Sequence, residues 1–106
     1  MADNARITDD PTSTASPARD AERARVHDAI AGDPAAFGRL YDAWFDRVHH
    51  LVARIVHDGE SAQDVCQDAF LSAWRGLGGL EDPTSFGGWL LRIAHNAALH
   101  PAAREG

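Results

Sequence analysis

Residues 61–74 read S-A-Q-D-V-C-Q-D-A-F-L-S-A-W, and this stretch decides the fold. Apolar side chains recur in it at steps of three and four residues, which places them on one face of an α-helix. Such a helix gains most of its stability from tertiary packing, so the stretch predicts a central helix of a helical core. The apolar stripe consists of Ala62, Val65, Cys66, Ala69, Phe70, Ala73, Trp74 and Leu77.

The polar face of this helix is open to two interpretations. A surface helix needs only a solvated coat, and the spacing alone favours that plain interpretation. Short Asp and Gln side chains nevertheless stand where Glu and Lys are usual, and Asp is a poor helix former, which hints at a second reason for the choice. The residues of this face are Gln63, Asp64, Gln67, Asp68, Ser72 and Arg75.

Length and composition indicate one small globular domain. The chain has 106 residues, of which 44% are hydrophobic and 25% charged. No apolar run approaches the roughly 18 residues that span a bilayer, and the N-terminus lacks the features of a signal peptide, so we expect no membrane span and a cytoplasmic location. The single Cys66 lies on the apolar stripe and is expected to be buried and unreactive.

The formal net charge is −6, and every basic residue other than histidine is arginine. This balance argues against charge-driven nucleic-acid binding by the chain as a whole, although it leaves room for a locally basic surface.

Three further helices are expected around the central one. Residues 1–17 are polar and predict a disordered lead, whereas residues 18–31 predict a short helix that Gly32 stops. Asp33 and Pro34 then form a start signal, with Asp as N-cap and Pro at the first helical position. The helix that follows is expected to run to about His57.

After the central helix, Gly76, Gly78 and Gly79 predict a loop to residue 85, and a last helix follows over residues 86–100. Pro101 is expected to end or kink it. The predicted fold class is therefore all-α, a compact bundle of three to four helices. The inward stripe of the last helix is Phe86, Trp89, Leu90, Ile93, Ala94 and Ala97, and Arg92, Asn96 and His100 form a polar row beside it.

The sequence offers no catalytic or metal-binding constellation. His49 and His50 point about 100° apart on a helix, and His57 is two turns from His50, too far for a helical zinc pair. Asp64 and Asp68 have no nucleophile or phosphate loop with them. We therefore expect no enzyme, no metal and no cofactor, with the histidines at the surface or its boundary.

The aromatic residues, three Trp and four Phe among them, are expected to be mostly core because they fall at helical spacing. One region could do more. A glycine-rich loop beside a row of Arg, Asn and His side chains predicts a pocket for an unstacked base.

Three segments of the chain resemble region 2 of bacterial ECF-type sigma factors. They are D-P-A-A-F-G-R-L-Y-D-A-W-F-D-R-V, S-A-Q-D-V-C-Q-D-A-F-L-S-A-W and S-F-G-G-W-L-L-R-I-A-H-N-A-A-L. The middle one follows the family pattern A-E-D-x-x-Q-[DE]-x-F-x-x-x-[WF], with Gln63 in place of Glu. The last contains W-L-x-x-I-A-x-N. The resemblance covers about residues 33–100 and implies a region 2-like domain over residues 18–106.

The resemblance implies two macromolecular contacts and no cofactor. One face would dock on the coiled-coil clamp helices of the RNA polymerase β′ subunit, through Gln63, Asp64, Gln67, Asp68 and Arg75. The other would hold the non-template strand of the promoter's minus-ten element, and the loop of residues 76–85 would receive a flipped base. Its residues would be Ser85, Trp89, Arg92, Asn96, His100 and Arg104.

The chain departs from the family after Asn96. The family continues as x-x-x-D-x-x-R-R, but this chain reads A-A-L-H-P-A-A-R-E-G, so fewer phosphate contacts are expected. No region 4 domain follows, which is consistent with an excised fragment, a truncated product or a solitary region 2 protein. A second hypothesis is therefore an interaction module that binds polymerase or an anti-sigma factor without promoter activity.

Overall fold

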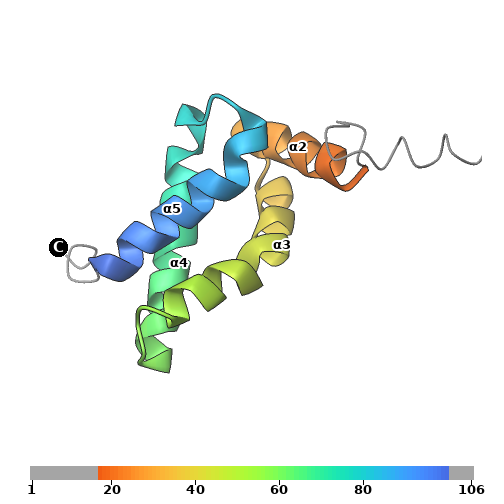
Figure 1. Cartoon of the computed structure of the whole chain (residues 1–106). Coiled ribbons are helices and arrows are strands. Elements are labelled where there is room, and N and C mark those ends of the chain that lie inside the picture. The colour runs from red at the N-terminus through yellow and green to blue at the C-terminus, as the bar shows by residue number, and fades with distance from the viewer. Residues whose placement is uncertain (1–16, 101–106) are drawn as a thin grey trace, which may run out of the picture.

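A computed structural model of the chain describes residues 17–100 (Figure 1). Four α-helices and two short 3₁₀ turns make up this part, and it contains no strand. The predicted all-α bundle is therefore confirmed. The predicted disordered lead lies outside the described residues except for Pro17, which already belongs to the first helix. The elements are α2 (Pro17–Ile30), α3 (Pro34–Ala53), α4 (Gly59–Gly76), η1 (Leu77–Gly79), η2 (Pro83–Ser85) and α5 (Phe86–Leu99).

The stop between α2 and α3 is built as the sequence predicts. Gly32 adopts a backbone φ of 105°, a conformation that side-chain-bearing residues rarely take. The Asp33 N–H then donates to the Asp28 carbonyl at 3.0 Å, which closes the end of α2. Asp33 caps the next helix, since its Oδ1 accepts a hydrogen bond from the Ala35 N–H at 3.0 Å.

Helix α3 ends at Ala53, and the predicted end at about His57 is wrong. The N–H groups of Ile55 and Val56 both donate to the Val52 carbonyl, at 2.9 and 2.8 Å. This tightens the last turn, and the chain then leaves the helix axis. Ile55 and Val56 are half-buried against the core outside the helix, so their apolar character belongs to the turn between α3 and α4.

The central helix α4 begins at Gly59 behind the N-cap Asp58. Asp58 Oδ2 accepts hydrogen bonds from the Ser61 hydroxyl at 2.7 Å and from the Ser61 N–H at 3.2 Å. These bonds favour the ionised carboxylate, and the side-chain bond to Ser61 is the main cause that lowers the pKa of Asp58.

The capping carboxylate makes stability sensitive to acid. Because the pKa of Asp58 is lower in the folded chain, the unfolded chain binds more protons near and below its ordinary pKa of about 3.9. The stabilisation is therefore present above that value and is lost as the pH falls through the lower folded value. Asn also caps helices but does not ionise. We therefore expect the melting temperature of the Asp58→Asn variant to fall less between pH 6 and pH 3 than that of the wild type.

Circular dichroism melts at a series of pH values test this expectation. Ser72→Ala, an exposed change later in α4, provides a control that keeps the wild-type pH profile. A profile for Asp58→Asn that is parallel to the wild type throughout would contradict the role of Asp58.

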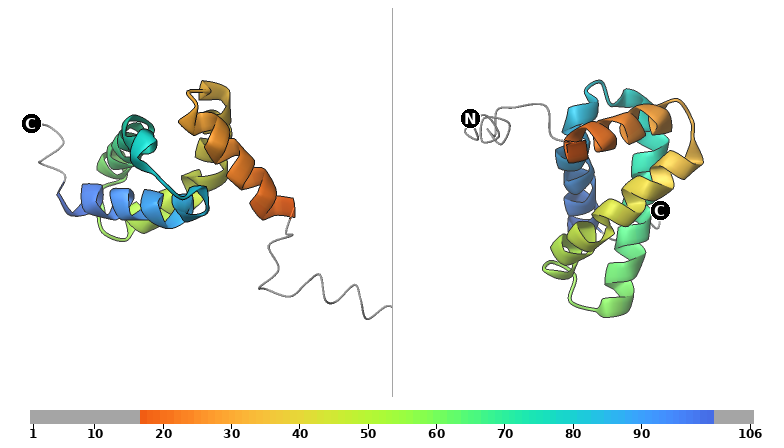
Figure 2. Two further views of the ribbon diagram at one scale, coloured as in Figure 1. Left: turned by 90° about the horizontal axis from the view of Figure 1, so that it is seen from above. Right: turned by 90° about the vertical axis from the view of Figure 1, so that its right-hand side faces the viewer.

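The helices pack as two pairs, and the two pairs cross each other. Helix α4 lies along α5, α2 lies against α3, and α3 crosses both α4 and α5 (Figures 1 and 2). Helix α2 also covers the end of the bundle that holds η1 and η2. The core that results is continuous, with Val26 from α2, Leu40 and Val52 from α3, and Phe86 and Leu90 from α5 among its fully enclosed side chains.

The predicted apolar stripe of α4 is buried apart from Trp74, which is half-buried. Cys66 has no exposed surface, and burial raises the pKa of its thiol, in keeping with an unreactive side chain. The expectation that most Trp and Phe rings are buried is too strong. Phe70 and Phe86 are buried, whereas the remaining five rings are half-buried and pack on the outside of the core, namely Phe37, Trp44, Phe45, Trp74 and Trp89.

Candidate functional site

The polar face of α4 projects to solvent as one surface. Gln63, Asp64, Gln67 and Arg75 are exposed, and Asp68 is half-buried. Steps of three and four residues place these groups along one side of the helix, opposite the stripe that packs on α3 and α5. All five residues expected to bind a partner therefore share a single accessible helix face.

An apolar groove borders this polar face, and the sequence analysis missed it. The groove has a volume of about 520 Å³ and lies between the start of α3 and the second half of α4. Its walls include Gln67 and Asp68 as well as apolar side chains. Leu71 is an apolar residue within the polar face, and 45% of its surface is exposed. A leucine at such a position is the sequence signal that could have revealed the groove. The apolar walls are Pro34, Phe37, Tyr41, Phe70, Leu71 and Trp74.

Aromatic pairs hold the walls of the groove in place. The ring centroids of Phe37 and Trp74 lie 5.0 Å apart, and those of Tyr41 and Phe70 lie 4.4 Å apart, both in tilted geometry. Such pairs contribute about 0.5–1.5 kcal/mol beyond the burial of their area. The groove is therefore a preformed apolar surface next to acidic and amide groups, a combination that suits a protein partner.

The polar row on α5 is shorter than predicted. Arg92 and Asn96 are exposed on the helix, but α5 ends at Leu99 and not at residue 100. His100 is the C-cap, with φ −130° and ψ 59°, so its side chain does not continue the helical row. Pro101 and Arg104 lie outside the described residues.

Trp89 and Ser85 lie at the start of α5, and each makes a structural contact. The Trp89 ring is half-buried, with its centroid 6.0 Å from that of Phe86. A Cβ at Gly76 would lie 3.7 Å from Trp89 Cζ2, so the indole reaches the end of α4. The exposed Ser85 donates its hydroxyl to Asp82 Oδ2 at 3.3 Å.

Asp82 organises the connection from α4 to α5. Its Oδ1 accepts hydrogen bonds from the Thr84 hydroxyl at 2.7 Å and the Thr84 N–H at 3.0 Å. These bonds, the side-chain bond first, lower the pKa of Asp82, with smaller contributions from Ser85 and from the positive charge of Arg23. Instead of a plain loop over residues 76–85, the structure has the two 3₁₀ turns η1 and η2, which restrict the backbone before α5.

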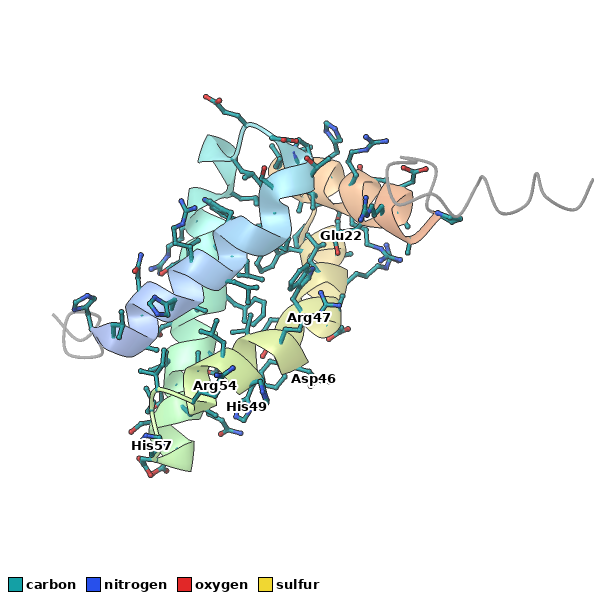
Figure 3. All side chains as sticks on the ribbon, in the orientation of Figure 1. Glu22, Asp46, Arg47, His49, Arg54 and His57 are labelled. Atoms are coloured by element: carbon teal, nitrogen blue, oxygen red, sulfur yellow. The ribbon has the colours of Figure 1, made fainter. Side chains whose placement is uncertain are left out.

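Trp44 joins three helices at the same end of the bundle. Its Nε1–H donates to Glu22 Oε1 of α2 at 3.0 Å, and its ring meets Phe86 of α5 at a centroid distance of 6.3 Å in edge-on geometry. The guanidinium carbon of Arg47 lies 4.5 Å from the centre of the Trp44 ring, a cation–π distance. Figure 3 shows Glu22 and Arg47 on α2 and α3. The start of α5 is thus tied to α2 through one indole.

The histidines lie at the surface or its boundary, as predicted. His49 is half-buried and stacks on Phe45 at a centroid distance of 5.8 Å, whereas His50 and His57 are exposed. Within residues 17–100 no three His, Cys, Asp or Glu side chains are close enough to hold a metal ion. None of the described helices is both long and apolar enough to cross a membrane.

Comparisons with known proteins show the family to which the chain is similar. Residues 40–106 match the sigma-70 region 2 family. The chain is 40% identical over 75 residues to the RNA polymerase sigma-H factor of Pseudomonas aeruginosa, covering 71% of this chain and 39% of that protein. It is 39% identical over 80 residues to the ECF RNA polymerase sigma factor SigM of Mycobacterium tuberculosis strain H37Rv, covering 76% and 40%.

A third relative is the ECF RNA polymerase sigma factor BldN of Streptomyces coelicolor, with 36% identity over 85 residues that cover 76% of this chain and 32% of that protein. The chain matches at most 40% of the length of these three relatives. The family match itself extends over more than half of the chain. The chain therefore belongs to the sigma-70 region 2 family and carries the region 2 domain of an ECF-type sigma factor.

Proposed function

We propose that this chain acts in transcription initiation by binding core RNA polymerase and opening the minus-ten promoter element. One observation carries the proposal: polar residues are exposed on two different helices, and Asp64, Gln67 and Asn96 among them stand at the family's motif positions. Asp64 and Gln67 on α4 form one surface, and Arg92 and Asn96 on α5 form another. A domain of this kind can hold polymerase and a DNA strand at the same time.

In this proposal α4 docks on the β′ clamp helices of the polymerase. The apolar groove beside α4 receives an apolar side chain of the partner, with Leu71 at its edge. Gln63, Asp64, Gln67, Asp68 and Arg75 supply the polar rim, which aligns the partner helix and steers its approach. Burial of the groove supplies affinity and the charged rim supplies orientation.

Strand opening is base capture, with no covalent step. Unstacking a base costs a few kcal/mol, and a site that fits only the extruded base offsets this free energy. The turns held by Asp82 restrict the connection between α4 and α5, so little entropy is lost when a base binds there. Ser85 and Trp89 border this site, and Arg92, Asn96 and His100 contact the strand that follows.

The test of polymerase binding is a charge reversal at Asp64. Because Asp64 is exposed on α4, we expect Asp64→Lys to leave the domain folded and to weaken binding to core polymerase by about tenfold or more. Biolayer interferometry with immobilised core polymerase measures the affinity. Asp28→Lys makes the same change of charge at an exposed position of α2 and is expected to bind as the wild type does. Equal affinity of the two variants would refute the α4 assignment.

A second candidate function is a protein-binding module without promoter activity, which holds polymerase or an anti-sigma factor. The apolar groove with the exposed Leu71 favours a protein partner on that face under either function. The two functions differ only in DNA binding. Polymerase binding without any affinity for a single-stranded minus-ten oligonucleotide, alone or in the complex, would favour the second.

A further inference from the structure

Few apolar side chains hold helix α2 to the rest of the domain. Of its 14 residues, only Val26 and Ala29 are buried. A helix of this length is marginal in isolation, so its position depends on what it packs against. The family match begins at residue 40, so α2 lies outside the matched region. Polar contacts therefore have a large share in fixing where α2 lies.

One of these polar contacts joins α2 to α3. The Nε1–H of Trp44 donates a hydrogen bond of 3.0 Å to Oε1 of Glu22, and both side chains are half-buried. Figure 3 shows Glu22 between the two helices. A charged acceptor makes such a bond stronger than one between neutral groups, and loss of the acceptor leaves a partly desolvated donor without a partner. Glu22 therefore restrains the rotation of the indole.

The indole carries this restraint on to the start of α5. Its ring meets Phe86 edge-on at a centroid distance of 6.3 Å. A Cβ at Gly87 would lie 2.7 Å from Cζ2 of Trp44, so the ring lies directly against the backbone of the first turn of α5. Phe86 and Gly87 follow immediately after η2, one of the turns where a base is proposed to bind. A rotation of the indole would therefore release the end of these turns.

Helix α2 also faces η2 directly. A cavity of about 460 Å³ lies between them, with Glu22 and Arg23 among the residues of one wall and Pro83 and Thr84 on the other. The hydrogen bonds from Thr84 hold the pKa of Asp82 below its ordinary value, and the positive charge of Arg23 adds a smaller contribution. Neighbouring residues of α2 thus act on both ends of η2, Glu22 through the indole and Arg23 through its charge.

We propose that Glu22 is a positioning residue for promoter opening, because it holds the Trp44 indole and through it the turns that receive the flipped base. The inference rests on the proposed promoter function and adds α2 to the base-binding site. Glu22 acts through Trp44 and not by contact with DNA, whose phosphates its carboxylate would repel. A base gains full affinity only when the groups around it are already in place. A loose indole therefore weakens capture of the flipped base.

Two substitutions at Glu22 separate the hydrogen bond from the charge. Glu22→Gln and Glu22→Ala both remove one negative charge, but only glutamine keeps an oxygen that can accept from the indole N–H. Charge alone predicts that both variants bind DNA slightly more tightly than the wild type. The hydrogen bond predicts that Glu22→Ala binds more weakly. Asp28→Ala removes an exposed acid of the same helix and shows the effect of charge alone.

Fluorescence anisotropy measures binding by the full 106-residue chain in complex with core polymerase. The probe is a fluorescein-labelled single strand that the wild-type complex selects from a random pool, together with copies that carry one abasic nucleotide at each position in turn. The position where the abasic change weakens wild-type binding most, by about tenfold or more, identifies the captured base.

We expect Glu22→Ala to bind the intact strand about tenfold more weakly than the wild type, and to bind the strand without the captured base as the wild type does. Glu22→Gln and Asp28→Ala should keep the wild-type ratio of the two affinities. Circular dichroism at the assay temperature checks that each variant is folded.

A merely structural role for Glu22 would not change this ratio, because the folded fraction of a variant affects both strands alike. If Glu22→Ala keeps the wild-type ratio, the positioning role is wrong and the promoter function stands. An equal loss in Glu22→Gln would show that the charge of Glu22 acts and not its hydrogen bond, which also overturns the inference. If the wild-type complex selects no strand, or loses affinity at no abasic position, the proposed function fails as well.

Discussion

Replacing Gly87 with alanine is expected to lower the free energy of unfolding by about 2–3 kcal/mol, because it forces a methyl group into an occupied position. A Cβ at Gly87 would lie 2.7 Å from Cζ2 and 3.3 Å from Cζ3 of Trp44, and closer still to Cη2. The indole cannot swing away without loss. Its Nε1–H is bonded to Glu22, and Arg47 covers its face. Urea unfolding followed by circular dichroism measures the effect.

The next residue provides the control for this prediction. A Cβ at Gly88 meets no atom within 4 Å, and Gly88 is exposed in the same turn of α5. Gly88→Ala should therefore stabilise the domain, by up to about 1 kcal/mol, through helix propensity alone. Trp44→Phe shortens the ring that blocks Gly87, so the double variant should be more stable than the sum of the single changes predicts. Equal stability of Gly87→Ala and Gly88→Ala would refute the close contact.

The fold could be predicted from local sequence signals because strong start and stop residues mark the ends of its helices. Asp33 and Pro34 start α3, and Gly32 ends the segment before it, as the structure confirms. The stripe on α4 is buried apart from Trp74, as its spacing indicates. The end of α3 was placed four residues too late because Ile55 and Val56 continue the apolar pattern beyond the helix. Periodicity reports burial, and a turn that covers the core is buried too.

The candidate surfaces were predictable only in part. The polar face of α4 follows from one helix, so its members could be named from spacing and family resemblance. The groove beside it depends on how α3 crosses α4. This crossing is not encoded in the pattern of a single helix.

The cluster formed by Glu22, Trp44 and Gly87 shows that contacts between side chains of different helices are not predictable from local patterns either. Glu22 precedes Trp44 by 22 residues, and Gly87 follows it by more than 40, yet all three meet at the end of the bundle. This cluster lies beside the turns that Asp82 holds, where a promoter base is proposed to bind. The packing that stabilises the domain therefore also positions its proposed DNA surface. Changes at Gly87 are expected to affect DNA binding more than binding through α4.

Phe86→Ala is expected to lower the free energy of unfolding by about 3–5 kcal/mol, as deletion of an enclosed aromatic ring does elsewhere. Phe86 has no exposed surface, and it contacts Trp44 and Trp89 at centroid distances of 6.3 and 6.0 Å. Both neighbours would face the cavity left by the ring. Small domains are stable by only about 5–15 kcal/mol, so this single change removes a large share of the total. Chemical unfolding at 25 °C gives the value.

Leu99→Ala serves as the comparison, because Leu99 lies on the same helix with 49% of its surface exposed. It should change stability by about 0.5 kcal/mol or less. Phe86→Leu keeps much of the apolar volume and should fall between the two, since a smaller cavity costs less. A loss for Phe86→Ala no larger than that for Leu99→Ala would mean that the start of α5 is not anchored in the core. The proposed placement of Ser85, Trp89 and the base-binding turns would then lose its structural basis.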